Sequence, residues 1–133
     1  MKVITTHLNA DFDGLASMIA VQKLYPDAVM VFPGSQEKNV RRFINETLQY
    51  RYKFERIKHI ELDLVDTLIV VDTRHKTRIG DFARCLDNPG LSLHLYDHHP
   101  DNSDVMKGEV ESIAPVGATT TLLCRILQKK KIP

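Results

Sequence analysis

The chain has 133 residues, which is a usual length for one domain and is long enough to bury a core without disulfide or metal cross-links. Hydrophobic residues make up 43% and charged residues 26% of the sequence, which excludes a disordered segment, a collagen-like repeat and a disulfide-rich scaffold. The 18 lysines and arginines nearly balance the 17 aspartates and glutamates, so the net charge of +1 gives no overall attraction to nucleic acid.

The sequence does not indicate membrane insertion or secretion. No apolar run reaches the roughly 18–20 residues that span a membrane, and polar residues follow Met1 too early for a signal peptide. Two cysteines, Cys85 and Cys124, are too few for a disulfide framework, and both have apolar neighbours in the sequence. We therefore expect both to be reduced core thiols of a cytoplasmic protein.

Apolar residues predict alternating strands and helices along the whole chain, with no internal repeat or interdomain linker. In chain order, we expect a strand at 3–6, a helix at 14–24, a strand at 28–32, a helix at 37–50, a weak strand at 57–60, a strong strand at 67–71, a short helix at 79–86, a strand at 91–96, a strand at 110–113 and a closing helix at 117–127. This order predicts the α/β class, with a mostly parallel, Rossmann-like sheet and helices on both faces.

Acidic and imidazole side chains follow three of these strands. In such sheets ligands bind outside the carboxyl ends of the strands, so these residues are expected at one edge. They are His7, Asp11 and Asp13 after the first strand, Asp72 after the strand 67–71, and Asp97, His98 and His99 after the strand 91–96. Four carboxylates packed together would repel one another strongly, and divalent cations are the simplest way to hold them there.

The mixture of ligands predicts the kind of metal. Carboxylates with imidazoles and no thiolate suit Mn, Co, Fe or Zn, and Mn is favoured where carboxylates dominate. Two ions about 3.5–4 Å apart would use this many ligands and would clamp a phosphate for attack by water. Asp72 is the natural bridge between them, because its strand is the most apolar and is expected to be central.

Each cluster also has a simpler interpretation. Asp13 alone is better explained as the N-cap of the first helix, Asp72 as a loop acid, and His98 with His99 as a surface pair. The metal interpretation is favoured because all three clusters fall at the same end of different strands.

Two further stretches have features of phosphate or nucleic-acid binding. Gly117, Thr119 and Thr120 open the last helix, whose free amides could bind an anion, although simple capping by threonine is the favoured explanation of this stretch alone. Arg74 is placed to neutralise phosphate oxygens. Residues 49–58 interleave aromatic rings with cations, as in surfaces that bind single strands, but an edge strand with its rings facing inward is the favoured interpretation.

Together, the motifs resemble those of the DHH phosphoesterase superfamily over nearly the whole chain. The run His7-x-Asn9-x-Asp11-x-Asp13, then Asp72, then Asp97-His98-His99 resemble its first three motifs, and residues 117–121 resemble the fourth. The resemblance implies two Mn²⁺ sites, with Mg²⁺ or Co²⁺ as alternatives. His7 and Asp11 would hold one ion, Asp13 and His98 the other, and Asp72 would bridge them. It also implies that Asp72, His98 and His99 are catalytic, that His99 lies on the phosphate side, and that Asp97 and Asn9 orient the ligands.

Residues 7–17 and 32–40 narrow the resemblance to the N-terminal DHH region of long bacterial proteins that join DHH and CBS domains to a tRNA nucleotidyltransferase or poly(A) polymerase. In the family a further metal-binding acid and a closing domain follow the fourth motif, whereas this sequence stops at Pro133. We therefore expect residues 1–133 to form the DHH N-terminal domain of a longer multidomain protein, with weak or no hydrolysis by this chain alone.

Three functions are compatible with these residues. The leading hypothesis is manganese-dependent hydrolysis of phosphoesters in nucleotides or single-stranded RNA or DNA. The alternative is an RNA-binding or regulatory module that serves an attached nucleotidyltransferase through C-terminal domains. A third is a metal-free α/β domain that only binds phosphate. None of the three requires a membrane partner.

Overall fold

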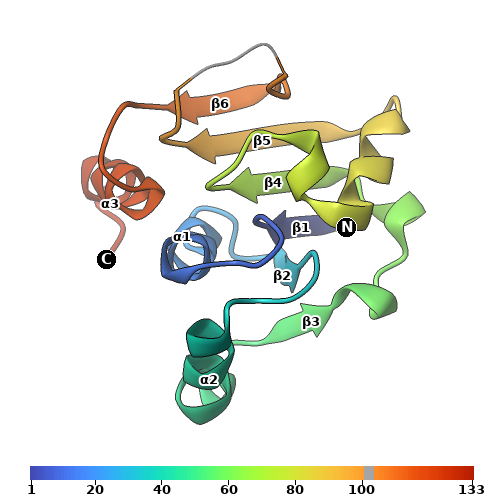
Figure 1. Ribbon diagram of the computed structural model, residues 1–133. Coiled ribbons are helices and arrows are strands. Elements are labelled where there is room, and N and C mark those ends of the chain that lie inside the picture. Colours follow the sequence, from blue (N-terminus) through green and yellow to red (C-terminus); the bar gives the residue numbers. More distant parts are fainter. Residues whose placement is uncertain (101–103) are drawn as a thin grey trace.

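The computed structural model describes residues 1–100 and 104–133 and contains one six-stranded sheet (Figure 1). Every neighbouring pair of strands is parallel, and the strand order is β3-β2-β1-β4-β5-β6. The strands are β1 (Lys2–Thr5), β2 (Val29–Phe32), β3 (Phe54–Arg56), β4 (Thr67–Val71), β5 (Ser92–Asp97) and β6 (Val110–Ile113). The winding reverses between β1 and β4, the type of place where such sheets bind ligands.

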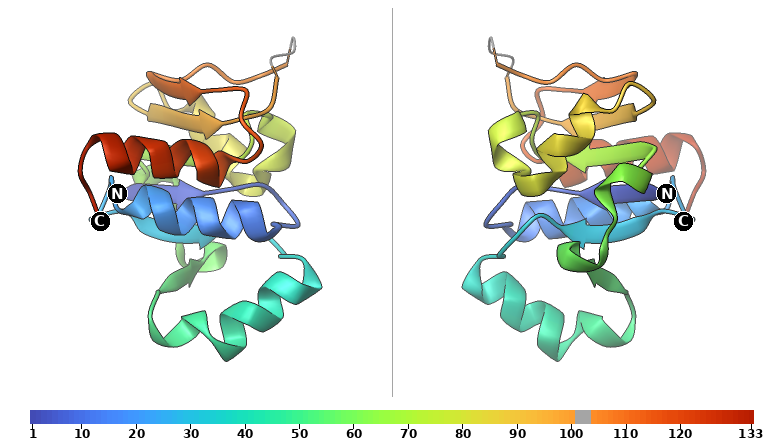
Figure 2. Two further views of the ribbon diagram at one scale, coloured as in Figure 1. Left: turned by 90° about the vertical axis from the view of Figure 1, so that its left-hand side faces the viewer. Right: turned by 90° about the vertical axis from the view of Figure 1, so that its right-hand side faces the viewer.

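One face of the sheet carries the α-helices. Helices α1 (Phe12–Gln22) and α3 (Thr119–Lys129) lie side by side on it (Figure 2). Helix α2 (Lys38–Glu46) follows β2 and adds Val40 to the same core. That core also contains Ile4 of β1 and Ile69 of β4, which point to this face because alternate strand residues do.

The opposite face is covered by 3-10 turns rather than by α-helices. Residues Gly80–Asp87 form the longest of these, and Phe82 within it packs against a second core that includes Val3, Leu68 and Val70. The expected α/β class with a parallel, Rossmann-like sheet is therefore confirmed, and both faces are covered. The helix expected at 79–86 is instead the 3-10 segment Gly80–Asp87.

Other boundaries differ from the prediction. The strand expected at 57–60 was wrong, because Ile57–His59 is a 3-10 turn and the strand is Phe54–Arg56, paired with Met30–Phe32 of β2. The helix expected at 37–50 ends at Glu46 and continues only as a 3-10 turn at Leu48–Tyr50. The strand β3 lies at the edge of the sheet and pairs only with β2.

The cysteines are both free thiols, but only one is in the core. Cys85 is buried, whereas Cys124 is exposed on α3, which corrects the expectation that both are core residues. No helix in the described part of the chain is long and apolar enough to cross a membrane.

Candidate metal centre

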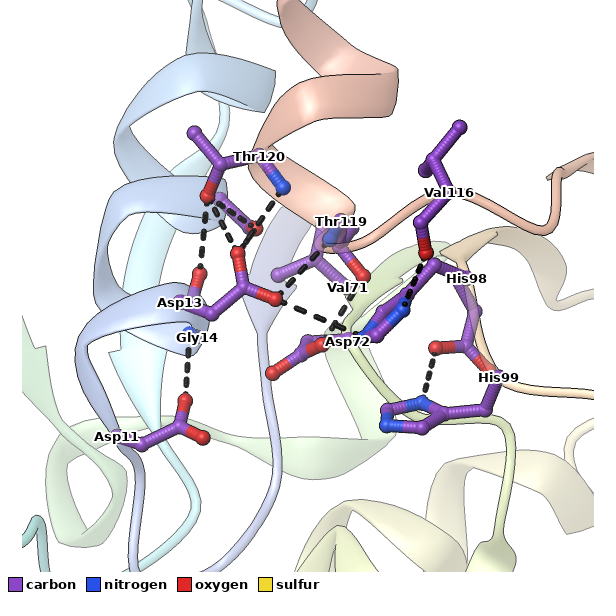
Figure 3. A network of polar contacts seen from close by, with 12 residues as sticks. Asp11, Asp13, Gly14, Val71, Asp72, His98, His99, Val116, Thr119 and Thr120 are labelled. Carbon is purple, nitrogen blue, oxygen red and sulfur yellow. Dashed lines mark hydrogen bonds and ion pairs between the residues drawn. The ribbon is translucent and has the colours of Figure 1, made fainter.

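The side chains that follow β1, β4 and β5 meet at the carboxyl edge of the sheet, next to the start of α1 (Figure 3). His7 Nε2 lies 3.2 Å from Asp72 Oδ2 and 3.6 Å from Asp11 Oδ1. On the other side, His98 Nε2 lies 3.5 Å from Asp72 Oδ1 and 3.8 Å from Asp13 Oδ2. Asp72 thus directs one carboxylate oxygen to each histidine.

The backbone at Asp72 is unusual and supports this position. Its φ of 66° is in the left-handed region, which aspartate and asparagine tolerate better than most residues. Its amide donates to the carbonyl of Tyr96 in β5, 2.9 Å away, and its side chain is only 3% exposed. The sharp turn after β4 therefore aims a buried carboxylate back across the end of the sheet.

Both histidines direct their Nδ1 atoms to carbonyl oxygens. His7 Nδ1 lies 2.9 Å from the carbonyl oxygen of Leu8 and 3.1 Å from Arg78 Nη2, and His98 Nδ1 lies 3.0 Å from the carbonyl oxygen of Val116. Since a carbonyl can only accept, Nδ1 of His98 carries a proton, and the Nε2 atoms of both rings face the carboxylates. Either a proton or a metal ion can neutralise the charge between an imidazole Nε2 and a carboxylate, so this donor set fits a metal ion.

The two acids near the start of α1 have different roles. Asp11, and not Asp13, is the N-cap, because its Oδ1 accepts from the amide of Gly14 at 2.9 Å. Glycine is required at position 14, since a Cβ there would lie 2.9 Å from Thr6 Oγ1. This close approach brings the start of α1 against the end of β1 and so keeps Asp11 near His7.

Asp13 is bound by the start of α3 (Figure 3). The amides of Thr119 and Thr120 each donate to its carboxylate at 3.0 Å, and Thr120 Oγ1 donates to its Oδ1 at 2.5 Å. Thr119 Oγ1 donates to Asp72 Oδ1 at 2.9 Å. The groups that sequence analysis assigned to a phosphate therefore hold two carboxylates of the centre in this structure.

Burial and neighbouring charges shift the pKa values of these groups. Burial and the nearby Asp13 raise the pKa of Asp72, despite hydrogen bonds from His7 and Thr119. Burial acts in the same direction on Asp13, but hydrogen bonds from Thr120 and Thr119 outweigh it and lower its pKa. Burial lowers the pKa of His7, but its hydrogen bonds to Asp72 and the Leu8 carbonyl outweigh this effect and raise it.

Asp97 offers one carboxylate oxygen within 4.8 Å of ligand atoms of Asp72, His98 and His99, but its hydrogen bonds go to other groups than those of Asp72. Its Oδ2 accepts from Arg74 Nε at 3.1 Å, and its Oδ1 accepts from His99 Nδ1 at 2.6 Å. Arg74 and Asp97 side chains are each 2% exposed, and Arg74 Nη2 also donates to the carbonyl of His99 at 2.7 Å. The guanidinium of Arg74 is therefore buried and fixes the loop that carries His99, and its contact with phosphate stays a prediction.

The remaining predicted residues lie at the rim. Asn9 is exposed, and its φ of 54° is in the left-handed region, which asparagine tolerates better than most residues. Its side chain forms no hydrogen bond to any residue that the structure describes. Gly117 lines a cavity of about 540 Å³ together with His98 and His99. This cavity is the open space next to the candidate ligands.

Sequence reasoning missed two residues of the centre. Arg78 Nη2 lies 3.1 Å from His7 Nδ1, and its positive charge opposes protonation of that ring. Ser17 is buried between α1 and α3, with its Oγ 3.4 Å from Asp13 Oδ1 and 3.2 Å from Thr120 Oγ1. Only the spacing of Ser17, one helical turn after Asp13, could have indicated it.

Fold and centre together define an α/β domain with a candidate metal site at the carboxyl edge of its sheet, and comparison with known proteins identifies its family. Residues 2–133 match the DHH family, N-terminal domain, so the chain belongs to that family. It is 45% identical over 132 residues to the A-adding tRNA nucleotidyltransferase of Geobacter sulfurreducens and 33% identical over 135 residues to that of Aquifex aeolicus. The matches cover 99% and 98% of this chain but only 15% and 14% of those proteins, and they correspond to their DHH regions.

Solved structures share the fold. An exopolyphosphatase-related protein from Bacteroides fragilis aligns with a TM-score of 0.76 at 15% identity, covering 98% of this chain and 40% of that one. A Methanococcus jannaschii protein assigned to the family II inorganic pyrophosphatases aligns with a TM-score of 0.73 at 21% identity, covering 99% and 40%. At these identities the likeness establishes the fold alone.

Proposed function

We propose that this domain hydrolyses phosphoesters of nucleotides or short oligonucleotides with two bound Mn²⁺ ions. The proposal rests on the carboxylate of Asp72, because its Oδ2 faces His7 and its Oδ1 faces His98. His7 and Asp11 would complete one site, and Asp13 and His98 the other. The ions would supply a water nucleophile at neutral pH and charge stabilisation for a phosphoryl group.

The residues of the chain position this chemistry. The Leu8 and Val116 carbonyls orient the two imidazoles so that Nε2 faces the carboxylates, and Thr119 and Thr120 fix the carboxylates. Asp97 holds Nδ1–H of His99, so that the Nε2 atom of this partly exposed ring is free to hold or donate a proton at a phosphate oxygen. Arg74 fixes the backbone beneath that ring.

Electron paramagnetic resonance of the Mn²⁺-loaded chain tests the proposal directly. Two ions that share a carboxylate give a spin-coupled signal, whereas two separate ions give the signal of isolated Mn²⁺. We expect coupling in the wild type, its loss in Asp72→Asn, and no change in the control Asp27→Asn, which alters an exposed acid paired with Lys2. A wild-type signal from isolated ions only would contradict the two-metal centre.

A second candidate function follows from the names of the curated relatives, which are tRNA nucleotidyltransferases. In this alternative the domain binds or positions RNA for an attached polymerase and hydrolyses little itself. Cleavage of a short RNA by the Mn²⁺-loaded chain would support hydrolysis, whereas RNA binding without cleavage at full metal loading, both by this chain and by a longer protein that contains it, would favour the alternative.

A further inference from the structure

A second cavity has a polar lining, formed by residues at the carboxyl ends of β2 and β3 and by α2. These elements lie together at the β3 edge of the sheet (Figure 1). The volume of the cavity is about 680 Å³, within the range of ligand sites. We call it the edge groove. Its principal lining residues are Gln36, Arg41, Asn45, Phe54, Arg56 and Lys58.

The charges of the edge groove are unbalanced. Arg41, Arg56 and Lys58 form no hydrogen bond or ion pair through their side chains with any residue in 1–100 or 104–133. The one acid in the lining, Glu55, is paired at 2.9 Å with Lys53 outside it. Three unpaired cations around a concave surface favour an anion with more than one charge.

The groove also offers an aromatic surface and amides. Phe54 lines it and stacks on the buried ring of Phe32, with centroids 5.3 Å apart and an interplanar angle of 24°. Gln36 and Asn45 provide hydrogen-bond donors and acceptors in the same lining. A rigid ring beside cations and amides is the combination that binds a base together with its phosphates.

The groove is joined to the metal centre by the backbone. The amide of Ala10 donates to the carbonyl of Ser35 at 3.3 Å, and the amide of Glu37 donates to the carbonyl of Ala10 at 2.9 Å. Ala10 directly precedes Asp11, so the wall of the groove and a candidate metal ligand belong to one hydrogen-bonded unit. A chain of nucleotides with one phosphate at the centre can therefore continue along this edge.

We propose that the edge groove binds a further nucleotide of a single-stranded oligonucleotide, with its phosphates on Arg41, Arg56 and Lys58 and its base near Phe54. This proposal rests on the proposed phosphoester function, and it makes an oligonucleotide a better ligand than a mononucleotide. RNA and DNA strands share the required chemistry.

The test is fluorescence anisotropy of a labelled five-nucleotide oligoadenylate with the metal-free chain. The variant Arg41→Glu/Arg56→Glu removes two cations of the groove, and Arg42→Glu/Arg51→Glu makes the same charge change at exposed arginines outside it. We expect at least tenfold weaker binding for the groove variant and less than a twofold change for the control. The slope of log K against log salt should fall by about 1.4 in the groove variant only, since each single-strand phosphate contact adds roughly 0.7.

Equal losses in the two double variants, or no loss in the groove variant, would overturn the proposal. Displacement of the RNA by inorganic polyphosphate at equal phosphate concentration would overturn the role given to the base. A DNA strand that binds as well as RNA would support recognition of base and phosphate, and preference for RNA would support added recognition of the 2′-hydroxyl. Mn²⁺ titration of both variants separates the two proposals, because neither variant touches the metal centre and both should bind Mn²⁺ like the wild type.

Discussion

Asp72 and Asp97 are both buried acids at the ends of neighbouring strands, yet their partners differ in kind. Asp72 faces two imidazole Nε2 atoms, whereas Asp97 is paired with the buried guanidinium of Arg74. The carboxylate of Asp72 can bind a cation from solution, whereas the carboxylate of Asp97 is already neutralised by the guanidinium of Arg74. Substitution by asparagine should therefore have opposite consequences at the two positions.

We expect Asp72→Asn to weaken Mn²⁺ binding by more than 100-fold while leaving the metal-free chain at least as stable as the wild type. Asparagine tolerates the left-handed backbone, and the change removes repulsion from Asp13, which raises the pKa of Asp72. Asp97→Asn should reduce Mn²⁺ affinity only 10–100-fold, as is typical of groups that orient ligands. Calorimetric titration measures both affinities.

The stability of Asp97→Asn should fall by about 3 kcal/mol, because Arg74 is left buried without its carboxylate. Urea denaturation in the presence of a chelator measures this loss and the expected stability of Asp72→Asn. Equal metal affinities for the two variants would remove Asp72 from the bridging role, and an unchanged stability of Asp97→Asn would show that Arg74 does not depend on the pair.

At the scale of elements, the start of α3 holds Asp13 on α1 through two amides and one hydroxyl. Thr120→Val should lower stability by about 1.5–2 kcal/mol, since it removes a hydrogen bond to a charged group. The matched control is Thr121→Val, an exposed residue one position later, for which we expect a change below about 0.5 kcal/mol. Urea denaturation without metal compares the two, and similar losses would mean that β-branching rather than the hydroxyl matters.

A second network of hydrogen bonds joins Tyr25, in the turn after α1, to residues in the first half of β5, at the opposite end of that strand from the metal centre. His94 Nδ1 lies 2.7 Å from Tyr25 Oη, and its Nε2 lies 2.9 Å from Ser92 Oγ. Burial lowers the pKa of His94 below its usual value. Between the folded and unfolded pKa values the unfolded chain therefore binds more protons, so this residue reduces stability as the pH falls below about 6.5.

We expect the fall in stability between pH 7 and pH 5 to be smaller in His94→Gln than in the wild type. His59→Gln, which alters an exposed histidine, should retain the wild-type pH dependence. Denaturation curves at several pH values with a chelator test this. His7 has a raised pKa and therefore adds stability as the pH falls, but this contribution is common to all three proteins and cancels in the comparison. Parallel pH profiles for all three proteins would contradict the role of His94.

At the scale of the whole molecule, metal binding should raise the melting temperature by mass action. An ion present at 100 times its dissociation constant stabilises the folded state by about 2.7 kcal/mol, which corresponds to roughly 10 °C for a chain of this size. We expect Mn²⁺ to produce this shift at lower concentration than Mg²⁺, because imidazoles favour the softer ion. Differential scanning fluorimetry with both ions and with Asp72→Asn tests it, and equal shifts by Mg²⁺ would count against the Mn²⁺ assignment.

Local patterns made much of the fold predictable. The apolar run of β4 before Asp72 is readable because a short continuous run of buried apolar residues is typical of a central parallel strand. The register of β3 was not readable, because Phe54–Arg56 contains two charged residues and is defined by its pairing with β2. Contacts between distant residues were equally hidden: nothing near Arg74 in the sequence indicates that its guanidinium is neutralised by Asp97.

The bond between Asp13 and the start of α3 also bears on the order in which the molecule is made. Asp13 belongs to the first helix, and the amides that hold it come 106 and 107 residues later. A nascent chain therefore contains nearly all the candidate ligands long before it can fix Asp13 among them. Asp13 is held only after α3 has been made and has docked, so a tightly held metal ion would report that synthesis has passed α3.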